Sequence, residues 1–125
     1  MKIIIETIAH KKQRYPTVGD WYTRKGVLHI RVSKMSDWRY ELLVALHELI
    51  EVHLCKKRGI SEKKVDAFDI AFEKARKPGN EDEPGDDPKA PYRREHFFAT
   101  NIEAIMSSEL GVDWAKYEKT INALP

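Results

Sequence analysis

Residues 41–53 combine an apolar stripe with a row of polar side chains at helical spacing. At about 100° per residue, one side of the predicted helix carries Leu42, Leu43, Leu46, Leu49, Ile50 and His53. The angular positions around the helix axis, measured from Leu42, are about 140° for His47, 180° for Glu51 and 240° for Glu48. The stretch therefore predicts a long helix that packs on a core through its apolar side. A metal site or a proton-transfer site would lie along the polar border of such a helix.

His47 and Glu51 are four residues apart, so they lie one helical turn apart on the same side of the helix. The pattern His47-Glu48-x-x-Glu51 resembles the zincin metallopeptidase signature His-Glu-x-x-His. In that signature two histidines on one helix bind zinc, and the glutamate between them is the general base. His47 and Glu48 match the first two positions, and Glu51 stands in place of the second histidine. A carboxylate ligand also makes the site more tolerant of Mn²⁺ or Mg²⁺.

The chain before this helix predicts strands. Ile3, Ile4 and Ile5 form a β-branched run, which favours a strand over a helix. Residues 18–23 and 27–33 flank a short turn, and apolar and polar side chains alternate in the second run, as in a hairpin with one dry face. A hairpin that leads directly into a His-Glu helix is the order found in minimal zincins. In those enzymes an edge strand lies beside the metal and could align an extended substrate.

Three further helices are expected after the long one, which starts near Ser36 and Asp37 and runs to about residue 57. Ser61 would cap the second helix, the third would span residues 92–110, and Asp113 would cap a short fourth helix. A length of 125 residues suits a single domain, residues 1–125. The expected fold class is α+β, in which a short N-terminal antiparallel sheet packs on three to four helices, similar to a minimal zincin.

Residues 78–91 form an acidic loop between the second and third predicted helices. Four prolines and two glycines preclude regular structure, and five acidic residues keep the loop in water. Asp86 or Asp87 could reach a metal, but the composition favours an acidic tether.

His96 and Glu103 are seven residues apart, and so nearly aligned on one face of the third predicted helix. In zincins whose third ligand is a glutamate, that ligand comes from a helix downstream of the motif, and by this resemblance His96 or Glu103 would fill its place. The expected site is a zinc ion held by His47, Glu51 and His96, with Mn²⁺ or Mg²⁺ as alternatives. Glu103 would be a fourth ligand or would orient His96. Glu48 would take a proton from a water molecule whose pKa the metal lowers, before that water attacks a carbonyl.

This site predicts a metal-dependent, peptidase-like hydrolase, and two other classes stay open. Glu48, Glu51, Asp66 and Asp69 resemble the Glu-x-x-Glu and Glu-x-x-Asp magnesium site of the all-α nucleotide pyrophosphohydrolases of the MazG type. The chain, and residues 84–96 in particular, is also similar to small proteins encoded in tailed-phage genomes, which implies a non-enzymatic accessory protein as the third class. In that class the degenerate site would be structural or empty, and the basic N-terminal region would bind a partner.

Charge and composition restrict the partners and the compartment. Residues 1–40 hold nine Lys and Arg against three acids, but the whole chain carries a net charge of only +2, which argues against a nucleic-acid module. The single Cys55 cannot form an internal disulfide, so a reducing cytoplasm is expected. No apolar run approaches the roughly 18 residues of a membrane span. The substrate or protein partner and the oligomeric state stay unknown at this level.

Overall fold

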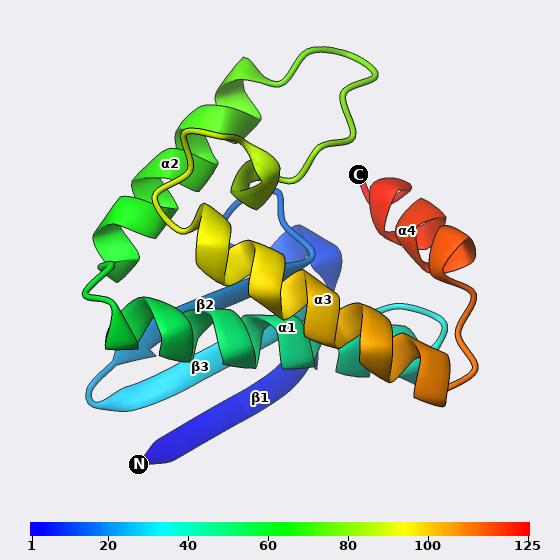
Figure 1. Cartoon of the computed structure of the whole chain (residues 1–125), viewed down its shortest axis with the longest axis horizontal. Coiled ribbons are helices and arrows are strands. Elements are labelled where there is room, and N and C mark those ends of the chain that lie inside the picture. The colour runs from blue at the N-terminus through cyan, green and yellow to red at the C-terminus, as the bar shows by residue number, and fades with distance from the viewer.

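The structure, a computed structural model, describes residues 1–125 and has the predicted α+β architecture (Figure 1). Three N-terminal strands form one sheet in the order β1-β3-β2: β1 (Lys2–Ile8), β2 (Gly19–Arg24) and β3 (Val27–Ser33). β2 and β3 are the predicted antiparallel hairpin. Its two-residue turn, Lys25 and Gly26, has positive φ at both positions (51° and 76°), as a tight hairpin turn requires.

The sheet is mixed, because β1 pairs with β3 in parallel, with Ile5 opposite Ile30. Ile8 and Gly19 both lie at the C-terminal end of β3, beside Ser33 and Val32. Residues 9–18, which include a short 3-10 helix (η1, His10–Lys12), therefore cross that end of β3 from one edge of the sheet to the other. β2 is consequently an outer strand, with one backbone edge free of strand partners.

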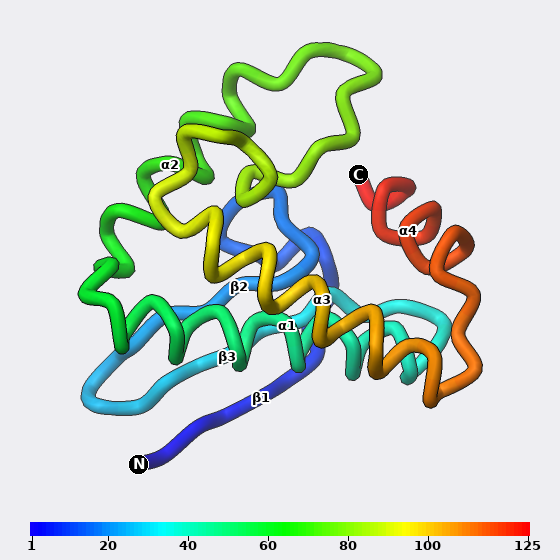
Figure 2. Tube along the Cα trace, in the orientation of Figure 1, coloured from blue at the N-terminus to red at the C-terminus, as the bar shows by residue number.

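The helices cover one face of this sheet and one another. α1 (Trp38–Lys57) packs on β2 and β3, and α3 (Arg93–Glu109) packs on α1. α2 (Glu62–Ala75) and α4 (Trp114–Asn122) lie at opposite ends of the α1–α3 pair (Figures 1 and 2). None of these helices is both long enough and apolar enough to cross a bilayer.

The helix boundaries follow the predicted capping residues. Asp37 accepts a hydrogen bond from the backbone N–H of Arg39 at the start of α1, and Ser61 and Asp113 make the equivalent bonds for α2 and α4. Gly59, at a φ of 72°, follows the end of α1. The main core lies between the sheet and α1, where Ile30, Val32 and Leu43 are almost completely buried.

The acidic loop, residues 78–91, contains one short regular element, although its composition predicted none. Pro84–Asp86 form one 3-10 turn, η2, with Pro84 at its first position, where the fixed φ of proline suits a helical start. The backbone N–H of Glu83 donates to the side chain of Asp86. Gly85 is buried within the turn, so this part of the loop packs on the body of the protein.

Candidate metal centre

Three donor atoms from α1 and α3 converge in the interior. His47 Nε2 lies 2.9 Å from Glu51 Oε2 and 3.1 Å from His96 Nδ1, and His96 Nδ1 lies 3.1 Å from the same Glu51 oxygen. Each of the three residues exposes only 5–6% of its surface. The structure therefore brings together the three residues that the sequence predicted as metal ligands.

The local sequence explains this convergence. The four-residue spacing sets His47 and Glu51 on one side of α1, as predicted. Ala99 is fully buried, and its small side chain lets α3 approach α1 closely one turn beyond His96. The second carboxylate oxygen of Glu51 accepts a hydrogen bond of 3.4 Å from the indole N–H of Trp21, which fixes the carboxylate from the sheet side.

The donor set and its dimensions fit a zinc ion. Two imidazoles and one carboxylate are a known ligand set of catalytic zinc sites. Zinc ligands at about 2.0–2.1 Å from a tetrahedral metal lie roughly 3.3 Å from one another. The three distances of 2.9–3.1 Å among His47, Glu51 and His96 are close to that value. His47, Glu51 and His96 are therefore the residues that would hold such a metal.

Glu103 holds His47 and not His96. Its Oε1 lies 2.8 Å from His47 Nδ1, on the side of the ring that faces away from the three converging donors. Its Oε2 accepts a hydrogen bond of 2.5 Å from the hydroxyl of Tyr117. The sequence predicted Glu103 as a fourth ligand or as the residue that orients His96, whereas the structure places its carboxylate against His47. When Glu103 accepts a hydrogen bond from the Nδ1–H of a neutral His47, the proton stays on Nδ1. The lone pair of Nε2 is then free to bind a metal.

The charges of the site compensate one another. Burial alone lowers the pKa of His47, but hydrogen bonds to Glu103 and Glu51 raise it well above its ordinary value. Burial also lowers the pKa of His96, but the neighbouring carboxylates of Asp86, Glu51 and Glu83 outweigh this effect. The pKa of His96 is raised to about 12. Burial raises the pKa of Glu51, yet its bonds to His47 and His96 lower it to about 2. The acidic surroundings therefore favour positive charge at this point, whether on imidazolium groups or on a metal.

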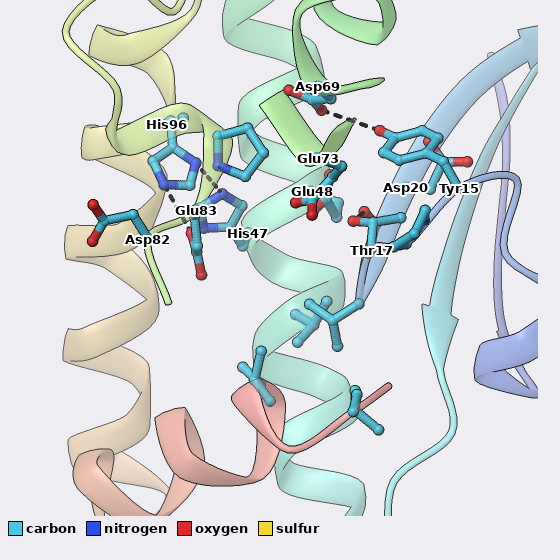
Figure 3. Close-up of a pocket in the computed structure, with 18 of the residues that line it drawn as sticks. Tyr15, Thr17, Asp20, His47, Glu48, Asp69, Glu73, Asp82, Glu83 and His96 are labelled. Atoms are coloured by element: carbon cyan, nitrogen blue, oxygen red, sulfur yellow. Dashed lines mark hydrogen bonds and ion pairs between the residues drawn. The ribbon is translucent and has the colours of Figure 1, made fainter. Parts of the chain in front are cut away.

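A cleft of about 420 Å³ opens beside these residues. It is bordered by the start of β2, α2, the acidic loop, α3 and α4, and His47, Glu51, His96 and Glu48 all contribute to its wall (Figure 3). The centre is therefore buried but reachable from the cleft.

Glu48 lies across His47 from His96 (Figure 3). Its carboxylate has no hydrogen-bond or ion-pair partner, and burial, followed by the charge of Glu51, raises its pKa well above the ordinary value. A Cβ atom at Gly19 would lie 2.7 Å from both Glu48 Oε1 and Val44 Cγ1, so a larger residue at that position of β2 would require these side chains to shift. Glu48 thus has an unpartnered carboxylate in the cleft wall, and its role as a general base stays a prediction.

The four carboxylates of the alternative magnesium site do not converge. Glu51 contacts the two histidines, and Asp66 forms an ion pair of 3.2 Å with Arg14. Asp69 accepts hydrogen bonds from the hydroxyls of Tyr15 and Tyr92. Only two groups of three or more potential metal ligands occur in the chain, and both include His96. No group joins Glu48, Glu51, Asp66 and Asp69.

Asp69 makes the stability of the metal-free protein depend on pH. Burial raises its pKa to about 7, although the bond from Tyr92 lowers it, against about 3.9 in an unfolded chain. Between these values the folded state binds one more proton than the unfolded state, so its stability falls as pH rises, by up to about 1.4 kcal/mol per unit. We expect Asp69→Asn to lose this slope between pH 4 and pH 7, measured by urea unfolding in a chelator. An unchanged slope in the variant would contradict the assignment.

The second ligand group consists of Glu83, Asp86 and His96. The sequence indicated that Asp86 or Asp87 could reach a metal. Asp86 does approach His96, whereas the side chain of Asp87 accepts a hydrogen bond from the backbone of Lys89 in its own loop. Glu83 was missed, as were the tyrosines that hold Glu103 and Asp69. The sequence signal for Glu83 was its spacing of three residues from Asp86, across Pro84 and Gly85. A single turn places both side chains on one side.

The chain matches no protein-family model, no curated protein sequence and no solved structure, so its function is inferred from the geometry of these residues.

Proposed function

We propose that this protein is a zinc-dependent hydrolase with a peptidase-like site, in which His47, Glu51 and His96 hold the metal. The observation that carries the proposal is the mutual approach of three buried donor atoms, within 2.9–3.1 Å, in the wall of an open cleft. A structural zinc site is closed by four protein ligands, whereas a catalytic site has three and keeps one position free. Three donors beside a cleft fit the catalytic class.

The chemistry divides between the metal and one residue of this chain. A divalent metal at this position would polarise a carbonyl group and lower the pKa of a water molecule. Glu48 would accept the proton from that water and pass it to the leaving group. Glu103 would keep the ring of His47 in the orientation and tautomer that a ligand needs. Glu48 points into the same cleft from the next position of α1, so one helix supplies two ligands and the base.

The position of β2 supports a peptide as the substrate. β2 is an outer strand of the sheet, and its first residues, Gly19–Trp21, line the cleft. A strand edge that has no partner strand can pair with an extended peptide through main-chain hydrogen bonds. A peptide bound along this edge would lie beside the three donors.

Glu48→Gln separates the base from the metal ligands. We expect zinc-loaded wild-type protein to cleave fluorescein-labelled casein. We expect the variant to retain zinc and lose about a hundredfold or more of that rate, because a general base contributes roughly 10²–10⁴. Peptide release would be followed by fluorescence and the cleaved bonds identified by mass spectrometry. A nucleotide panel incubated with Mg²⁺ serves as control and should release no phosphate. Casein cleavage that survives Glu48→Gln, or nucleotide hydrolysis by the wild-type protein, would overturn the proposal.

A further inference from the structure

The outer nitrogen of His96 lies against the acidic loop. His96 Nε2 is buried and lies 2.9 Å from Glu83 Oε2 (Figure 3). It lies 3.2 Å from Asp86 Oδ1, and neither contact has hydrogen-bond geometry. His96 itself exposes 5% of its surface, whereas the side chains of Glu83 and Asp86 are 49% and 54% exposed. Two carboxylates from the surface thus approach a buried ring nitrogen that has no other partner.

The loop is shaped to make this approach. The turn η2 sets Glu83 and Asp86 three residues apart, and the backbone of Glu83 is tied to the side chain of Asp86 by a 3.2 Å hydrogen bond. Between them, Gly85 lies directly on the imidazole: a Cβ there would be 2.3 Å from His96 Cγ and 2.5 Å from Nδ1. Any side chain at Gly85 would therefore displace the ring. The turn contacts both the face and the outer nitrogen of His96.

The same arrangement occurs at the other histidine. His47 directs Nε2 to the converging donors and Nδ1 to Glu103, and His96 directs Nδ1 to the donors and Nε2 to Glu83 and Asp86. A histidine that binds a metal commonly donates its other N–H to a carboxylate, which fixes the orientation of the ring. We propose that Glu83 and Asp86 are positioning residues of the metal centre, which hold His96 so that Nδ1 faces Glu51 and His47. This inference rests on the proposed function.

Glu83 and Asp86 are not a second metal site of their own. A neutral imidazole has one nitrogen with a free lone pair, and the other nitrogen carries the proton. If Nδ1 binds the metal beside Glu51, Nε2 bears the hydrogen and can only donate. Glu83 and Asp86 then place two negative charges beside that N–H, at 2.9 and 3.2 Å from Nε2, and attract it electrostatically. The acidic loop, expected from its composition to be a tether, becomes part of the support of the centre.

The test compares two pairs of substitutions in the same loop. Glu83→Gln/Asp86→Asn removes both carboxylates that face His96. Glu81→Gln/Asp82→Asn makes the same change of charge, but Glu81 bonds to Asn122 and the carboxylate of Asp82 has no partner. Each protein is titrated with Co²⁺, whose visible spectrum reports the ligand geometry, and with Zn²⁺ against a chelating dye. We expect a 10–100-fold weaker Kd and an altered Co²⁺ spectrum for the first pair. The control pair should stay within about twofold of the wild type, since surface changes of this kind have small effects.

The outcomes separate this inference from the metal centre itself. Wild-type binding with unchanged affinity and spectrum in Glu83→Gln/Asp86→Asn would overturn the positioning role and leave the centre intact. Two metals per wild-type chain, one of them lost in that variant, would show that the carboxylates are ligands and would also overturn it. No metal binding by the wild-type protein would overturn both proposals. Melting curves in chelator show whether each variant is folded, so a loss of affinity is not mistaken for unfolding.

Discussion

Added zinc should raise the melting temperature of the wild-type protein by about 10 °C or more. A ligand that binds only the folded state stabilises it by about 4 kcal/mol at a concentration a thousand times its Kd. A domain of this size gains roughly 2–8 °C for each kcal/mol. The three donors come from two helices that only the folded chain brings together, so the unfolded chain has no comparable site. Differential scanning calorimetry of untagged protein, with and without zinc, measures the shift.

The matched control is His47→Ala/His96→Ala, which removes two of the three donors. Zinc should not raise the melting temperature of this variant. Its melting temperature without metal will be lower than that of the wild type, because buried groups lose their partners. His53→Ala controls for weak binding at other histidines, since His53 bonds to the backbone of Leu49 on the same helix and takes no part in the centre. A zinc shift of equal size in the double variant would place the binding elsewhere and refute this site.

Loss of the Glu103 carboxylate should have the largest effect on the metal-free fold. Glu103→Ala leaves Nδ1 of His47 and the hydroxyl of Tyr117 without partners in the interior. Removal of one member of a buried, hydrogen-bonded ion pair costs about 3–5 kcal/mol, which we expect as a lower free energy of unfolding in urea. Glu103→Gln keeps the shape of the side chain, so its free energy of unfolding should fall by less. Its zinc affinity should fall by 10–100-fold, because the ring of His47 is less well oriented.

Glu109→Ala is the control on the same helix. Glu109 is exposed, so this change should alter the free energy of unfolding by no more than about 0.5 kcal/mol. A Glu103→Ala protein as stable as the Glu109→Ala protein would show that the pair between Glu103 and His47 contributes nothing to the fold. The expected order of stability is therefore wild type and Glu109→Ala first, then Glu103→Gln, then Glu103→Ala.

The parts of this structure that depend on local sequence could be predicted. The spacing of His47 and Glu51 fixes their common side of α1, and Asp37, Ser61 and Asp113 fix helix starts, because each effect acts within one turn. The hairpin follows from alternation and a short turn. His96 was predicted from its alignment with Glu103 on a later helix and from the resemblance to zincins, in which the third ligand comes from a downstream helix.

The remaining features depend on contacts between distant segments. The parallel pairing of β1 with β3 is set by the path of residues 9–18 around the sheet, which no local pattern encodes. Glu103 orients His47 and not His96 because of the way α3 crosses α1. The acidic loop approaches His96 because Gly85 fits against the ring, and composition alone indicates only that such a loop is polar.

Metal analysis of the protein itself tests the central claim most directly. Untagged wild-type protein, purified without chelator, would be analysed by inductively coupled plasma mass spectrometry beside His47→Ala/His96→Ala, because a polyhistidine tag would itself bind zinc. The proposed centre predicts about one zinc per wild-type chain and none in the variant. The absence of zinc and other transition metals from the wild-type protein, together with no uptake of added Zn²⁺, Mn²⁺ or Mg²⁺, would contradict it.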